Sequence, residues 1–131
     1  MARKYLARKY LARKYTETVT FQTSPDVVMA CVANVFVNRF HAEPERGPRG
    51  VTAQTKRSAS GWGENITAIV DEVGPEGTIV TIYSESVNPL GFFERNNNKH
   101  NVQMLIAQVG RLVAAGGPPG AGGPGGLYAG G

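Results

Sequence analysis

The chain has 131 residues, of which 41% are hydrophobic, and carries a formal net charge of +4. This length suits one domain of about 100 residues with a modest core and excludes a second folded domain. The single cysteine, Cys31, excludes an intramolecular disulfide and a zinc site built from several thiolates. No stretch approaches the ~20 apolar residues of a membrane span and no signal peptide is recognisable, so we expect a cytoplasmic protein.

The chain begins with the tetrapeptide ARKY written three times, as MARKYLARKYLARKYT. This segment contains basic but no acidic residues, whereas acidic residues outnumber basic ones in the remainder. We interpret residues 1–14 as a basic arm that contacts an anionic polymer such as nucleic acid, an anionic membrane surface or a neighbouring subunit. The contact residues would be Arg3, Lys4, Arg8, Lys9, Arg13, Lys14, Tyr5 and Tyr10.

A duplicated coding segment is the alternative interpretation of the repeat. Deletion of two copies leaves MARKYTETVTF, which leads directly into the first predicted strand. A five-residue period also does not place the apolar residues on one face, either in a helix or in a strand.

Residues 15–23, YTETVTFQT, alternate between two sides with period two and predict a strand. The following Ser-Pro-Asp favours the start of a helix, which we predict over residues 27–40. This helix is apolar nearly all round and should be buried on more than one side. Because a sheet covers only one side, we expect the second helix, a second subunit or an apolar ligand to cover the rest. The residues expected to make that contact are Val28, Val32, Phe36 and Trp62.

Three further strands are predicted after a Pro- and Gly-containing loop over residues 41–50. They cover residues 51–58, 64–73 and 78–86, and the turn GPEG predicts that the last two pair as a hairpin. A second helix with a single apolar stripe is predicted within residues 99–115. We expect one of Asn96, Asn97 and Asn98 to cap it.

Residues 116–131 contain nine Gly and three Pro, which predicts a flexible low-complexity tail. The domain organisation is therefore an arm over residues 1–14, one domain over residues 15–115 and a tail over residues 116–131.

No arrangement of residues indicates an enzyme, a cofactor or a metal site. His41, Glu43 and Glu45 alternate within a Pro-containing loop and lack a second cluster of ligands. Cys31 lies in an apolar helix, where a thiol behaves as a small hydrophobic group. The acidic residues around the predicted turn, from Asp71 to Glu76, are interpreted as a solvated edge that could attract a basic arm.

Together these patterns predict an α+β, two-layer sandwich of order β-α-β-β-β-α, with an antiparallel sheet and both helices on one face. The apolar first helix and the two low-complexity ends favour a non-catalytic, self-associating module, a homo-oligomer whose basic arm contacts an anionic partner or neighbouring subunit. The alternative is a carrier of a small apolar ligand, held in a pocket between the sheet and the first helix.

Overall fold

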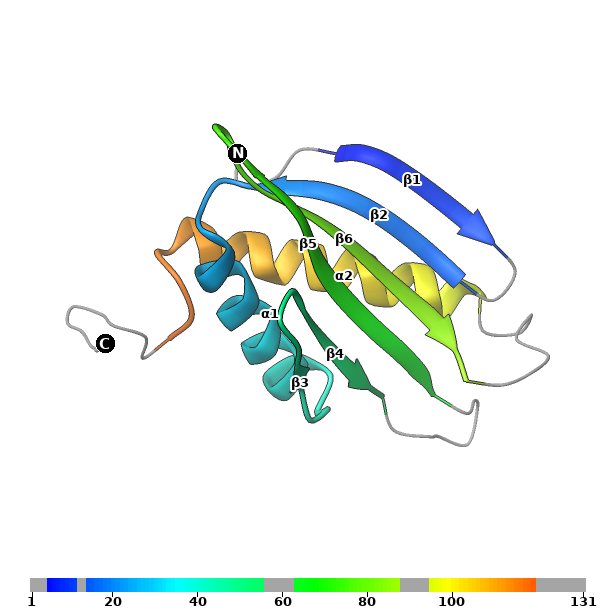
Figure 1. Cartoon of the computed structure of the whole chain (residues 1–131). Coiled ribbons are helices and arrows are strands. Elements are labelled where there is room, and N and C mark those ends of the chain that lie inside the picture. Colours follow the sequence, from blue (N-terminus) through cyan, green and yellow to red (C-terminus); the bar gives the residue numbers. More distant parts are fainter. Residues whose placement is uncertain (1–4, 12–13, 56–62, 88–94, 120–131) are drawn as a thin grey trace.

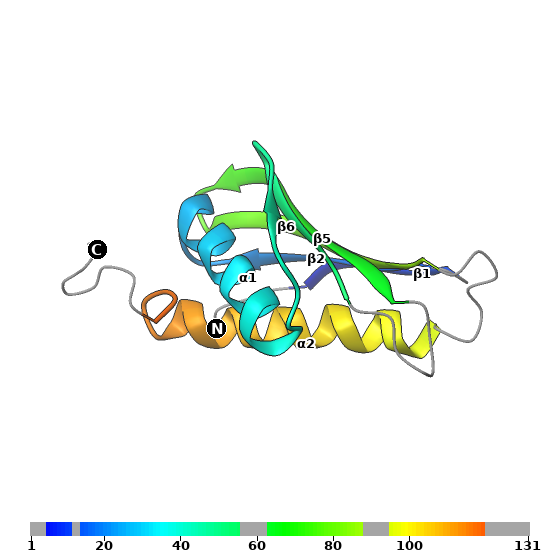
Figure 2. The same cartoon turned by 90° about the horizontal axis from the view of Figure 1, so that it is seen from below.

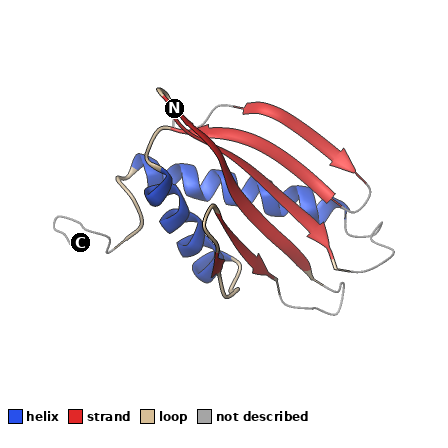
Figure 3. Ribbon diagram, viewed as in Figure 1, coloured by secondary structure: helices blue, strands red, loops and turns tan. Residues whose placement is uncertain are grey.

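The structure, a computed structural model, describes residues 5–11, 14–55, 63–87 and 95–119. A six-stranded antiparallel sheet forms one layer, and two helices lie on one of its faces (Figures 1 and 2). The elements coloured in Figure 3 are β1 (Tyr5–Leu11), β2 (Lys14–Phe21), α1 (Pro25–Arg39), β3 (Glu45–Arg46), β4 (Gly50–Gln54), β5 (Glu64–Gly74), β6 (Gly77–Ser86) and α2 (Arg95–Ala114). The predicted α+β class and the placement of both helices on one face are confirmed.

The strand order is β1-β2-β6-β5-β4-β3, so β2 and β6 lie inside the sheet although they are distant in sequence. The two strands β1 and β3 were not predicted, and each lies at one edge. The helix α2 begins at residue 95, four residues before the predicted range. The three asparagines of residues 96–98 are therefore inside the helix, and the expectation that one of them caps it was wrong.

The start and end of α1 follow from local chemistry. The side chain of Ser24 accepts a hydrogen bond from the backbone N–H of Val27 at 3.4 Å, and Pro25 takes the first helical position. The helix ends where His41 adopts a positive φ of 53° and the backbone N–H of Ala42 donates to the carbonyl of Phe36 at 2.9 Å. This closing bond is typical of a left-handed helix terminus.

The apolar surface of α1 is buried within the domain. Val28, Val32 and Phe36 have no exposed surface and belong to one core cluster with residues of the sheet and α2. Among the described residues of this helix, Val37 is the large apolar side chain left open, at 49% exposure. The excess apolar surface that motivated a subunit or ligand contact is therefore covered by the sheet and α2, and self-association stays a prediction without that support.

The hairpin between β5 and β6 confirms the predicted turn. Gly74 pairs with Gly77, and Gly77 has a φ of 130°. A Cβ at Gly77 would overlap the carbonyl oxygen of Phe21, so the close packing of this turn against the end of β2 requires glycine. Immediately before β4, Arg49 donates to the carbonyls of Val70 and Asp71 at 2.7 and 2.8 Å, where the β5–β6 register shifts.

Residues 5–11 of the predicted basic arm form an edge strand of the sheet. This strand, β1, pairs antiparallel with β2, and the register places Arg8 opposite Glu17 and Tyr10 opposite Tyr15. The free edge of β2 offers backbone donors and acceptors, which explains why a segment without an apolar face is ordered there. Arg3, Lys4 and Arg13, the other arm residues named for contact, lie outside the described residues.

Deletion of residues 2–11 should expose the edge of β2, because it removes both leading copies of the repeat and with them β1. We expect the free energy of unfolding to fall by about 2 kcal/mol from lost cross-strand pairs, with concentration-dependent association through the open edge. Deletion of residues 2–6 keeps the pairs from Ala7 to Leu11 and should behave like the full chain. Urea denaturation and light scattering measure both effects. Equal stability and monodispersity of all three proteins would contradict a structural role for the repeat.

Candidate functional site

The inner face of the sheet changes from apolar to polar along its strands. Apart from Thr78, the inward-facing residues near the β5–β6 turn are apolar, as expected for a core. Towards the other end of the same strands, the inward-facing positions are occupied by Tyr15 and Glu17 of β2, Glu64 of β5, and Ser84 and Ser86 of β6. All five side chains are buried, with at most 7% exposure. A polar patch therefore lies inside the domain rather than on its surface.

The N-terminal half of α2 covers this polar patch. Figure 2 shows that α2 runs along the sheet, whereas α1 lies over one end of it. From α2, Asn98, Asn101 and Gln103 donate hydrogen bonds to residues of the patch. We call these eight residues the buried polar cluster: Tyr15, Glu17, Glu64, Ser84, Ser86, Asn98, Asn101 and Gln103.

Glu17 is fully buried, and the described residues donate hydrogen bonds to one of its two carboxylate oxygens. Its Oε2 accepts a hydrogen bond from the hydroxyl of Tyr15 at 2.6 Å and another from Nε2 of Gln103 at 3.3 Å. Its Oε1 is buried and accepts a hydrogen bond from none of the described residues. More than nine in ten buried polar groups in folded proteins have a hydrogen-bond partner, so this oxygen is an exception that requires an explanation.

Glu64 anchors the second part of the cluster. Its Oε1 accepts from Nδ2 of Asn101 at 2.9 Å and from the hydroxyl of Thr55 at 3.2 Å. Asn101 also lies 3.3 Å from the hydroxyl of Ser84, which donates to Oδ1 of Asn98 at 2.8 Å. These bonds tie β5 and β6 to the first turns of α2, so the helix is fixed over the patch by polar contacts.

The electrostatic character of the cluster is acidic. It holds two carboxylates, and no described basic side chain forms a hydrogen bond or ion pair with either of them. Lys14 lies instead with its Nζ 4.2 Å from the centre of the Tyr83 ring, and Lys99 and His100 are exposed. The arrangement therefore suits a hydrogen-bond donor or a cation.

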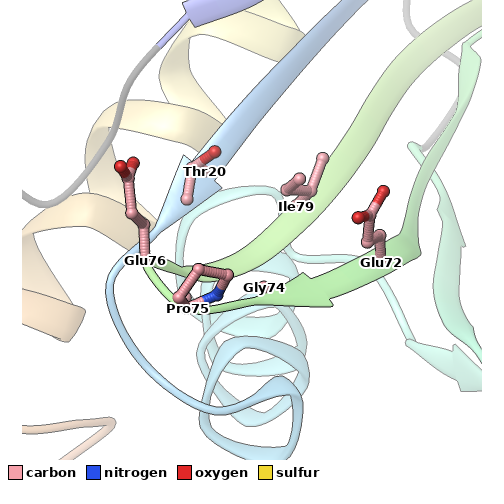
Figure 4. Close-up of a pocket in the computed structure, with 7 residues that line it drawn as sticks. Thr20, Glu72, Gly74, Pro75, Glu76 and Ile79 are labelled. Carbon is pink, nitrogen blue, oxygen red and sulfur yellow. The ribbon is translucent and has the colours of Figure 1, made fainter.

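A separate hollow of about 260 Å³ lies at the β5–β6 turn. Figure 4 shows Thr20 and Ile79 between the carboxylates of Glu76 and Glu72, with Pro75 below them. Both glutamates are exposed, which matches the predicted solvated acidic edge. Because solvent screens charges here, this hollow is a weaker candidate for specific binding than the interior.

The residues predicted to contact an apolar ligand are not brought together at a site. Val28, Val32 and Phe36 are packed into the core beneath α1, whereas the buried polar cluster lies under α2. Trp62 lies outside the described residues. Within the described chain, no group of three or more His, Cys, Asp or Glu side chains could hold a metal, and no helix is long and apolar enough to cross a membrane.

Sequence reasoning missed the buried polar cluster, although its signal was present. Glu17 shares a side of its strand with Tyr15, Val19 and Phe21, and a carboxylate on an otherwise apolar strand face is unusual. Asn98 was interpreted as a possible cap, yet it is fully buried and bonds to the sheet.

Cys31 should be unreactive in the folded protein. Burial raises the pKa of its thiol to about 11, so at pH 8 the thiolate fraction is about 0.1%. We expect labelling by a thiol reagent only after denaturation.

Because the folded-state pKa of Cys31 exceeds the unfolded value, the stability contributed by the neutral thiol should be lost as the pH rises above about 9. A Cys31→Ala variant should show a shallower loss of unfolding free energy between pH 8 and pH 10.5, and rapid native labelling would contradict the prediction.

Together, Tyr15 and Glu17 should contribute little to the free energy of unfolding. Tyr15→Phe alone removes a donor from a buried carboxylate and should cost about 1–3 kcal/mol. The double variant Tyr15→Phe/Glu17→Met replaces both partners by apolar groups and should be at least as stable as the unmodified protein, because the uncompensated carboxylate is gone. Urea denaturation at pH 7 measures the three proteins. A double variant less stable than Tyr15→Phe would show that the carboxylate serves folding.

Comparison with known proteins identifies the fold and nothing more specific. Neither a protein family model nor a curated protein sequence matches the chain. Among solved structures, the chain is similar to CalU16 from Micromonospora echinospora, with a TM-score of 0.53 and 15% sequence identity, over 87% of each chain. At this identity the likeness supports a shared arrangement of sheet and helices, and it carries no assignment of function.

Proposed function

We propose that this protein binds a small molecule inside the domain, between the inner face of the sheet and the N-terminal half of α2. The observation that supports this proposal is the buried Oε1 of Glu17, which has no partner among the described residues while the rest of the cluster is hydrogen-bonded. A ligand that donates to this oxygen would complete the network.

The energetic argument favours a functional role over a structural one. Burying a carboxylate costs several kcal/mol unless hydrogen bonds compensate it. Here a phenol and one amide donor compensate one oxygen, and no described group donates to the other. A core selected only for stability would place apolar side chains at Glu17 and Glu64, as it does further along the same strands. Polar groups kept at such a cost are typical of binding sites.

This proposal keeps the carrier function, which was the alternative to self-association in the sequence analysis, but moves its site and changes its ligand. Val28, Val32 and Phe36 are packed beneath α1 without a buried polar group that lacks a partner, whereas Glu17 lies under α2, so we place the ligand there. Its recognised group would be polar. We assign no catalytic role, and we keep the cytoplasm as the proposed location because Cys31 is a free thiol.

Self-association is the second candidate, and it now rests on the edge strand β1. This strand ends the sheet on one side, so its outer backbone could pair with a partner strand. Arg8 and Lys9 within it disfavour pairing with a second copy of the same strand and favour an acidic partner.

Native mass spectrometry of protein purified from its own host tests ligand binding. We expect the unmodified protein to retain a small molecule and the Glu17→Gln variant to lose it, since the amide lacks the second acceptor oxygen and the charge. Glu72→Gln is the matched control, because Glu72 is an exposed glutamate of the same sheet. Retention of the same mass by all three proteins, or by none of them when folded, would contradict the proposal.

A further inference from the structure

We infer that residues 1–4, the part of the basic repeat that precedes β1, dock into the hollow at the β5–β6 turn of the same chain. Lys4 would place its ammonium group at the carboxylate of Glu76. This inference goes beyond the proposed function and does not depend on it, because the hollow lies on the outer face of the sheet and the buried polar cluster on the inner face.

The hollow combines apolar walls with acidic side chains. Ile79 and Pro75 contribute to its lining, and the carboxylates of Glu72 and Glu76 lie on either side of it (Figure 4). Both glutamates are exposed, and none of the described residues that line the hollow is basic. A lysine side chain fits such a place, since its aliphatic stem packs on apolar surface while its charged end stays at the solvent and reaches a carboxylate.

The register of β1 leads the chain to this hollow. Tyr5, the first residue of β1, lies opposite Val19 of β2. The next residue of β2 is Thr20, whose side chain lines the hollow. Residues opposite each other in an antiparallel pair share a face, with their Cβ atoms about 5 Å apart. A chain that continues this register by one residue therefore places Lys4 on the outer face, beside Thr20.

Glu76 is the carboxylate within reach of that position. The turn that carries it packs against the end of β2, since a Cβ at Gly77 would overlap a backbone oxygen there. Figure 4 shows Glu76 next to Thr20 and Glu72 beyond Ile79. Thr20 pairs with Ile79, which pairs with Glu72. Three strand spacings, about 14 Å, thus separate the Lys4 position from Glu72, which is more than the two side chains span together.

Docking of residues 1–4 would withhold part of the charge of the arm from other anions. Arg3 and Lys4 carry two of the six positive charges of residues 1–14. An anionic polymer would have to compete with Glu76 for them, in a contact that salt weakens because the charges are exposed. An exposed ion pair contributes little to the free energy of unfolding, so the expected stability after deletion of residues 2–6 is unchanged.

Carbodiimide cross-linking of the full chain at low salt tests the contact, because this reagent joins an amine to a carboxylate without a spacer. We expect an amide between Lys4 and Glu76. In an equal mixture of unlabelled and heavy-isotope-labelled protein, mass spectrometry should find it within one isotope. Glu76→Gln should abolish this cross-link. The matched control Glu45→Gln should keep it, since Glu45 is an exposed glutamate at the opposite edge of the sheet.

Binding of a fluorescent single-stranded DNA at low salt tests the consequence. Glu76→Gln should bind about threefold more tightly than Glu45→Gln, although both variants lose one negative charge, because only the first frees cations of the arm. The difference should disappear when both variants also carry Arg3→Gln and Lys4→Gln.

Three results overturn the inference. They are the absence of a cross-link between Lys4 and Glu76, a cross-link that joins the two isotopes as its main product, and equal DNA affinity of Glu76→Gln and Glu45→Gln. The mixed product would assign the hollow to the arm of a neighbouring molecule. None of these results bears on the proposed function, which the small molecule retained in native mass spectrometry tests separately.

Discussion

The burial of Glu17, whose Oε1 accepts a hydrogen bond from no described group, is the main energetic constraint on this domain. A single folded domain is stable by only about 5–15 kcal/mol, so a buried, incompletely bonded carboxylate uses a large part of that margin. The protein tolerates it because Tyr15 holds Oε2 at 2.6 Å and because the rest of the inner face is a well-packed apolar core. Stability and the polar cluster are thus supplied by different ends of the same sheet.

This division follows from how the helices are placed. Where both helices meet the sheet, Val32, Phe36 and Val109 are fully buried and close the core. Where the N-terminal half of α2 covers the sheet, hydrogen bonds from Asn98 and Asn101 replace apolar packing. Hydrogen bonds are directional, so they fix the position of a helix more narrowly than apolar contacts do. A fixed helix above a charged group is the arrangement that a preorganised binding site needs.

The sequence predicted the elements that local patterns determine. Period-two alternation located β2, β5 and β6, and the GPEG turn identified their hairpin, because strand faces and tight turns are encoded by neighbouring residues. The edge strand β1 was not predictable in this way, since its order comes from pairing with β2 and its own repeat gathers no apolar face. The sequence also does not decide whether the second helix, a second subunit or a ligand covers the rest of α1, and in the structure α2 covers it. How much surface α2 covers depends on the crossing of two helices that are distant in sequence.

The candidate site was missed because pattern reading treats each strand face as uniform. Glu17 stood on an apolar face, and that exception was the informative residue. Its hydrogen bonds become visible only when α2 is placed beside it, since one comes from Tyr15, two residues earlier in β2, and the other from Gln103 of α2.

The repeat at the N-terminus connects these observations. Its third copy supplies Tyr15, which bonds to Glu17, and its second copy forms the strand that lies next to them. Without that strand, β2 would be an edge of the sheet, and edge strands exchange their backbone hydrogen bonds with water and open more readily than internal strands. If the repeat arose by duplication of a short coding segment, the added strand would have moved Glu17 from the edge strand of the sheet to an internal strand. An origin as a copying event and a role in shaping the site are compatible, because the duplicated copy needs only to pair with β2, and extended backbone of almost any sequence can do so.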